Sequence, residues 1–177
     1  MNYQKGDVVL VIGDESPSGK TRAIELLLPQ LELAGFTPVA MKPVETACPP
    51  LDDHDIGSRD GATLHRLLRG RVPLPILVPY RFRAPGPSRD AARAVGLELT
   101  LGDLVHTMNE ASRYGDILVV EVAGSLHSAL AEDGQVLELA ERVSGKLLPV
   151  GGMTPQGEAT LAVAAARGLT VVREPGV

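Results

Sequence analysis

Residues 13–21 have the composition of a loop that binds phosphate. They read Gly-Asp-Glu-Ser-Pro-Ser-Gly-Lys-Thr, one residue longer than the usual phosphate-loop spacing, with an intact Gly-Lys-Thr at the end. A glycine-rich turn before a helix offers backbone amides to phosphate, the lysine reaches its outer oxygens, and the threonine hydroxyl can hold Mg²⁺. The predicted nucleotide-binding residues are Gly13, Glu15, Ser18, Gly19, Lys20 and Thr21.

Two acidic residues are candidates to hold Mg²⁺ together with Thr21. Glu121 closes an apolar run, where Mg²⁺-dependent phosphate enzymes often place a carboxylate, although a strand end can also carry a solvent-facing charge. Asp60 stands at the start of a predicted helix, where an aspartate is more often a cap or a partner of the helix dipole. The sequence leaves both alternatives open.

A lysine follows the second apolar strand directly. Lys42 precedes a proline, which keeps the chain extended, so its ammonium is expected at the carboxyl edge of the sheet, where it could neutralise substrate charge. A solvated lysine at a strand end is equally compatible with this position. Residues 52–55 offer metal-ligand types without rigid spacing and are expected to form a solvated loop. His65, His106 and His127 have no partner visible in the sequence, and Cys48 is expected to be incidental.

Strands and helices alternate along the chain and must position these residues. Apolar runs predict strands over residues 8–12, 37–41, 116–121, 146–150 and 169–172, and helical spacing predicts helices over residues 20–34, 60–68, 135–144 and 156–167. Thr100 and Asp103 form a capping box that begins a further helix, Pro29 is a flaw inside the first helix, and the proline-rich residues 72–87 are expected to be mostly irregular. This alternation predicts an α/β fold with a doubly wound, mostly parallel sheet and helices on both faces.

Composition limits the classes of function. A chain of 177 residues and 18.6 kDa predicts a single domain over residues 1–177, and a net charge of −5 argues against nucleic acid as a partner. Apolar runs are short and interrupted by charge, so we expect no membrane segment. The lone Cys48 cannot form an intrachain disulfide, which favours a cytoplasmic location.

Several short motifs resemble, in order and spacing, those of the ATP-dependent dethiobiotin synthetase family. They are the long phosphate loop, Met-Lys-Pro-Val-Glu-Thr at 41–46, Asp-Gly-Ala at 60–62, Val-Pro-Tyr-Arg-Phe at 78–82 with Ala-Pro at 84–85, and Val-Glu-Val-Ala-Gly at 120–124. Together they cover about residues 7–172. Weak motifs in the right order are far more specific than any one of them alone.

The resemblance implies a ligase and a set of residue roles. Such an enzyme binds diaminopelargonate, CO₂ and MgATP, forms a carbamate, phosphorylates it and closes the ureido ring with loss of phosphate. By position, Lys20 and Lys42 would be catalytic, and Thr21, Asp60 and Glu121 would hold Mg²⁺. The substrate-binding residues implied are Lys42, Thr46 and Gly124. The family works as a homodimer with small-molecule substrate at the subunit interface.

An alternative is a divergent, non-catalytic relative that acts as a nucleotide-binding or protein-interaction module. Val122 and Ser125 stand where the family usually has glycines, and Pro17 removes a possible phosphate donor. Residues 151–156 form a shorter loop than the family's, without its Asn-His pair, and the family's Asn-Asp base-recognition motif and C-terminal segment have no counterpart here. Since a fold does not guarantee a function, both possibilities remain open at this point.

Overall fold

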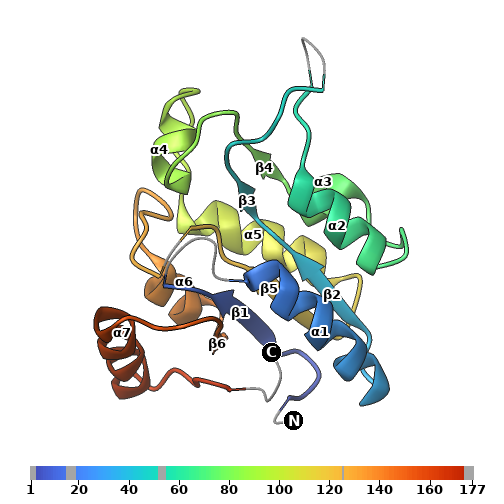
Figure 1. Ribbon diagram of the computed structural model, residues 1–177, viewed down its shortest axis with the longest axis vertical. Helices are drawn as coiled ribbons and strands as arrows, with labels where there is room; N and C mark the ends of the chain where they lie inside the picture. Colours follow the sequence, from blue (N-terminus) through green and yellow to red (C-terminus); the bar gives the residue numbers. More distant parts are fainter. Residues whose placement is uncertain (1–2, 15–18, 52–54, 125, 174–177) are drawn as a thin grey trace.

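A four-stranded parallel sheet forms the centre of the molecule (Figure 1). The computed structural model describes residues 3–14, 19–51, 55–124 and 126–173. Strands β1 (Val8–Ile12), β2 (Pro38–Met41), β5 (Ile117–Glu121) and β6 (Lys146–Pro149) pair in the order β2-β5-β1-β6, with every pair parallel. Their runs of aliphatic residues are buried on both faces, as expected for a sheet covered on both sides.

Helices cover both faces of this sheet. Helix α1 (Lys20–Leu33) packs on β1, β2 and β5, whereas α5 (Leu101–Ser112) packs on β2 and β5 from the other side and contacts α6 (Val136–Arg142) (Figure 1). The remaining helices are α2 (Arg59–Leu67), α3 (Leu74–Leu77), α4 (Ser88–Arg93) and α7 (Pro155–Ala166). The predicted α/β class with a doubly wound, mostly parallel sheet is confirmed.

Local signals placed several helix ends correctly. Thr100 accepts a hydrogen bond from the backbone of Asp103, and the Asp103 carboxylate accepts one from the backbone of Thr100, so the predicted capping box begins α5. Pro29 does not divide α1, which runs unbroken from Lys20 to Leu33.

None of the helices in the described ranges is long and apolar enough to cross a membrane.

One segment differs from the prediction, and another contains short elements that the prediction did not specify. Residues 169–172 were expected to form a strand but make only an isolated bridge, between Val171 and Leu147. The N–H of Leu147 donates to the carbonyl of Thr170, the N–H of Val172 donates to the carbonyl of Leu147, and the ladder stops there. Residues 72–87 are mostly irregular, as expected, and they also contain α3 and the short strand β4 (Tyr80–Arg81), which pairs in parallel with β3 (Val44–Glu45). A two-residue strand is too short to leave a periodic signal.

The parallel order brings three chain segments to one edge of the sheet. Strand β1 leads into Gly13 and Asp14, where the predicted phosphate loop begins, β2 leads into Lys42, and β5 ends at Glu121. Because β1 and β2 both pair in parallel with β5, which lies between them, the carboxyl ends of the three strands lie at the same edge. This is the edge at which open α/β sheets bind ligands.

Candidate active site at the carboxyl edge of the sheet

Lys42 lies between two carboxylates. Its Nζ donates to Glu121 Oε1 at 2.9 Å and makes a short contact with Asp60 Oδ2. The Lys42 side chain is 13% exposed and that of Glu121 only 3%, so neither is the solvated charge that the sequence left open. Burial alone lowers the pKa of Lys42, but the charges and hydrogen bonds of Glu121 and Asp60 outweigh it, and the net pKa is raised. Lys42 is therefore held as a cation.

Asp60 does not cap its helix. The cap of α2 is Ser58, whose Oγ accepts a hydrogen bond from the backbone N–H of Gly61 at 2.8 Å. Asp60, the second residue of the helix, instead turns its carboxylate to Lys42. The cap alternative for Asp60 is wrong, because the preceding serine already supplies the acceptor that the first turn requires.

The end of the phosphate loop joins the same cluster. Thr21 Oγ1 donates to Glu121 Oε2 at 2.9 Å, while Lys20 Nζ donates to the carbonyl oxygen of Gly124 at 2.9 Å. Gly19 caps α1 in the left-handed region with a φ of 80°, which favours glycine. Each oxygen of the Glu121 carboxylate thus has its own donor, one on α1 and one at the end of β2.

Lys20 has a different electrostatic environment from Lys42. The Lys20 side chain lies in a buried position, and desolvation lowers its pKa. Glu121 and Asp60 oppose this shift, while the nearby charge of Lys42 adds to it. A buried ammonium with a lowered pKa gains most from an additional anion beside it, as a nucleotide phosphate would supply.

Gly13 and Gly124 connect the two loops above the sheet edge. The carbonyl of Gly13 accepts a hydrogen bond from the backbone N–H of Leu126 at 2.8 Å. Gly124 has a φ of 74°, and a Cβ on it would lie 2.7 Å from Ser128 Oγ. Only glycine fits here without strain, and its carbonyl is the one that Lys20 contacts.

A buried carboxylate in the phosphate loop was missed by the sequence analysis. Asp14 is 6% exposed and accepts a hydrogen bond from the backbone N–H of Thr154 at 2.8 Å, and its carboxylate also contacts the hydroxyl of that residue. These contacts at the first turn of α7 lower the pKa of Asp14 although burial opposes them, and His127 Nε2 lies 3.2 Å away. His127 Nε2 lies at ion-pair distance from Asp14 but makes no hydrogen bond to it, and the sequence could not reveal this proximity because the two residues come from different loops.

The structure does not place every predicted residue in the cluster. Glu15 and Ser18 lie outside the described residues, as do Pro17 and Ser125. Thr46 directly follows β3 and is half-buried, and within the described part of the chain no hydrogen bond joins it to Lys42, Asp60 or Glu121. Cys48 is buried, and desolvation raises the pKa of its thiol, which does not suit a nucleophile.

The oxygen donors of this cluster fit a magnesium ion. Thr21, Asp60 and Glu121 bring one hydroxyl and two carboxylates to the sheet edge. Mg²⁺ in phosphate-transfer sites is usually bound by one or two carboxylates together with substrate phosphates and water, rather than by a complete protein cage. Among the described residues, no group of three or more His, Cys, Asp or Glu residues suited to a metal occurs.

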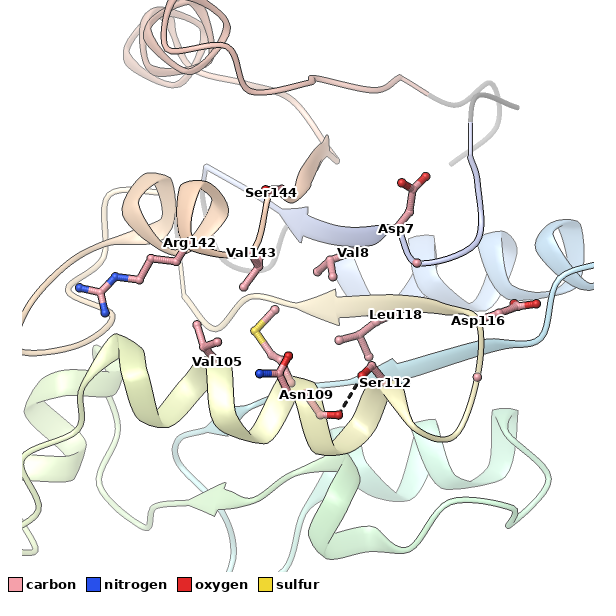
Figure 2. A pocket seen from close by; sticks show the side chains of 13 residues that line it. Asp7, Val8, Val105, Asn109, Ser112, Asp116, Leu118, Arg142, Val143 and Ser144 are labelled. Carbon is pink, nitrogen blue, oxygen red and sulfur yellow. Dashed lines mark hydrogen bonds between the residues drawn. The ribbon is translucent and has the colours of Figure 1, made fainter.

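A hollow of about 630 Å³ lies at the opposite edge of the sheet, at the amino ends of β1 and β5 (Figure 2). Side chains of α5, among them Val105 and Asn109, line it together with Asp7, Asp116 and Arg142. None of the predicted site residues lines this hollow. The chemistry-bearing residues gather at the carboxyl edge instead.

Comparison with known proteins finds ATP-dependent dethiobiotin synthetases among the relatives. No model of a known protein family matches the chain. The chain is 29% identical over 167 residues to the ATP-dependent dethiobiotin synthetase of Anaeromyxobacter sp. (strain Fw109-5), covering 92% of this chain and 73% of the relative. It is 29% identical over 175 residues to that of Corynebacterium diphtheriae, with coverages of 93% and 72%. It is 30% identical over 154 residues to that of Methylobacterium nodulans, with coverages of 81% and 67%.

Proposed function

The chain belongs to the dethiobiotin synthetase family of ATP-dependent ligases, and we propose on this premise that it closes the ureido ring of dethiobiotin. The substrates would be 7,8-diaminopelargonate, CO₂ and ATP. The observation that carries the proposal is the meeting of Lys20, Thr21, Lys42, Asp60 and Glu121 at one sheet edge. Two cations and two carboxylates beside a phosphate loop suit a reaction that moves a phosphoryl group between anions.

The reaction would proceed in three steps. One amine of the substrate bonds to the carbon of CO₂ and loses a proton, which gives a carbamate. A carbamate oxygen then attacks the γ-phosphorus of ATP, and ADP leaves. Finally the second amine attacks the carbamate carbon, a proton is lost, phosphate leaves, and the five-membered ring is closed.

Each residue of the cluster has a proposed part in these steps. Lys20 would bind the outer phosphate oxygens of ATP, and Lys42 would neutralise the carbamate and the phosphoryl group moving towards it. Thr21, Asp60 and Glu121 would hold Mg²⁺, which neutralises phosphate charge when bound. Support comes from the hydrogen bonds that already join Glu121 to both Thr21 and Lys42. Preformed placement of this kind lowers the cost of reorganisation during the reaction.

The remaining roles are proposals by position. Gly13, Glu15, Ser18 and Gly19 would complete the phosphate cradle, and Thr46 and Gly124 would contact the substrate. We also propose one domain over residues 1–177, a homodimer with substrate at the subunit interface, and a cytoplasmic location, where ATP is available. Size-exclusion chromatography with light scattering tests the dimer.

The test of the function is detection of dethiobiotin by mass spectrometry. Purified protein is incubated with diaminopelargonate, bicarbonate, Mg²⁺ and a panel of nucleoside triphosphates, because the nucleotide preference is open. We expect product from the wild type and none from Lys20→Ala or Lys42→Met.

The matched control is Lys146→Met. Lys146 forms a comparable half-buried ion pair, with Asp7 at 2.6 Å, at the amino end of the sheet and away from the cluster. This variant should still form product. Absence of product from folded wild-type protein with every nucleotide would refute the ligase and favour the non-catalytic relative, which the replacement of a family glycine by Val122 suggests.

A further inference from the structure

Glu45 is a buried carboxylate to which neither the sequence motifs nor the proposed reaction assigns a part. It is the second residue of β3 and is 5% exposed. Its backbone is held by β4, since its carbonyl accepts a hydrogen bond from the N–H of Phe82 at 2.9 Å, and Cys48 Sγ lies 3.3 Å from the same oxygen. The backbone of Glu45 is therefore held in place at the end of β3.

The Glu45 carboxylate binds the first turn of α2. Its Oε1 accepts hydrogen bonds from the backbone N–H groups of Arg59 at 2.9 Å and Asp60 at 3.3 Å, and its Oε2 makes a short contact with the hydroxyl of Ser58. These are amides at a helix N-terminus, where a negative charge is favoured. A buried acid of this kind is stabilised because both its oxygens are satisfied.

The same helix turn has little freedom to move. A Cβ on Gly61 would lie 2.3 Å from Ser58 Oγ and 2.6 Å from Leu74 Cδ1 of α3. The start of α2 thus lies between the serine, α3 and Glu45. From this turn the Asp60 carboxylate contacts Nζ of Lys42.

We propose that Glu45 is a positioning residue that acts through the first turn of α2 to aim the Asp60 carboxylate at Lys42. Lys42 and Glu45 are three residues apart in the chain, so the contacts from Lys42 to Asp60 and from Asp60 N–H back to Glu45 close a short ring. This inference rests on the proposed function, in which Asp60 holds Mg²⁺. It assigns to Glu45 the geometry of that site and no contact with substrate.

The first test measures kcat and KM of Glu45→Ala and Glu45→Gln in dethiobiotin formation. We expect Glu45→Ala to lower kcat about 100-fold, because a displacement near 1 Å of a positioned group can have that effect, with KM for the nucleotide changed less than about twofold. Glu45→Gln keeps one oxygen acceptor and should recover about tenfold of this loss, because one acceptor still holds the helix turn.

The matched control is Asp133→Asn. Asp133 also accepts a backbone hydrogen bond at a helix start, from Leu101 N–H of α5 at 2.7 Å, but α5 carries no residue of the cluster. Urea unfolding of all variants gives their stabilities. A kcat for Glu45→Ala within threefold of that of Asp133→Asn would overturn the proposal, as would an equal rise in KM with unchanged kcat.

The second test does not depend on activity. A double-mutant cycle of Lys42→Met and Asp60→Asn, followed by urea unfolding, measures the coupling between these two side chains. We expect a measurable coupling in the wild-type background and none in the Glu45→Ala background. An undiminished coupling refutes the positioning role even if the wild type forms no dethiobiotin, so failure of this inference and failure of the proposed function can be told apart.

Discussion

Removing the ammonium of Lys42 should destabilise the fold by an amount that its burial determines. In Lys42→Met, Glu121 loses the donor on its Oε1 while its side chain stays 3% exposed. Removing one partner of a buried ion pair typically costs 3–5 kcal/mol, roughly, because the other charge is left without compensation. Thr21 still donates to Glu121 Oε2, and the Lys20 ammonium remains nearby.

The loss should lie at the lower end of this range, because Thr21 still compensates one oxygen of Glu121. We therefore expect Lys42→Met to lower the free energy of unfolding by about 3 kcal/mol. With a urea dependence of about 2 kcal/mol per molar, the unfolding midpoint should fall by about 1.5 M.

The double variant Lys42→Met with Glu121→Gln distinguishes the ion pair from simple loss of packing. It leaves no buried charge at either position, so its free energy of unfolding should lie within about 1 kcal/mol of the wild type. Urea unfolding followed by circular dichroism measures all variants. Should Lys42→Met shift the midpoint by less than about 0.3 M, or the double variant be as unstable as the single one, the argument from burial is wrong.

Lys146→Met again serves as the control for this prediction. Its partner Asp7 is 9% exposed and Lys146 itself 18%, so water compensates more of the lost charge than at Glu121. We expect a smaller loss in the free energy of unfolding than for Lys42→Met, because Asp7 is more exposed than Glu121. Product formation should remain, which separates loss of stability from loss of function.

Two further predictions concern Gly124 and the acid limb of stability. Gly124→Ala should lower the free energy of unfolding by about 2 kcal/mol and weaken nucleotide binding, which calorimetry measures. The control is Gly35→Ala, which is also at a positive φ (88°) but has open space where the Cβ would lie. It should lower the free energy of unfolding by only about 1 kcal/mol and leave nucleotide binding unchanged. The pKa of Asp103, held down first by the Thr100 hydroxyl, and that of Asp133, held down by Leu101 N–H, lie below the ordinary 3.8. The stabilisation that these two carboxylates give the fold is complete above pH 3.8 and is lost as the pH falls through their folded pKa values. The urea midpoint of the wild type should therefore drop below about pH 4, and it should drop less steeply in Asp103→Asn. Equal slopes for the two proteins would refute this prediction.

Much of the sheet could be predicted from its aliphatic runs. Strand β1 begins and ends where the sequence indicated, because a β-branched run buried on both faces has few alternatives. The isolated bridge at Val171 shows the limit of the same signal. An apolar run indicates that a segment is buried, but it does not indicate how many of its backbone amides form hydrogen bonds with a neighbouring strand. The pairing of β3 with β4 depends on two segments about 36 residues apart and has no local trace.

The candidate site divides in a similar way. Lys20 and Lys42 could be predicted because each stands next to a strand or helix end, so its place at the sheet edge follows from chain order. Glu45 and Asp14 could not, because their partners, the first turns of α2 and α7, reach them only in the folded chain. A buried acid that binds a helix start looks in sequence like any other acid.

The two lysines of the site have different electrostatic environments, which suit them to different roles. Lys42 has two carboxylates and a raised pKa, so its charge is already compensated and it serves as a fixed cation. Lys20 donates to the carbonyl of Gly124, and desolvation lowers its pKa, so a phosphate oxygen offers it a stronger, charge-assisted bond than that carbonyl. We therefore expect Lys20 to exchange Gly124 for the nucleotide while Lys42 stays in place. Glycine at position 124 then matters twice. Its positive φ holds the carbonyl beside Lys20 before the nucleotide binds, and its lack of a Cβ avoids a close contact with Ser128 Oγ.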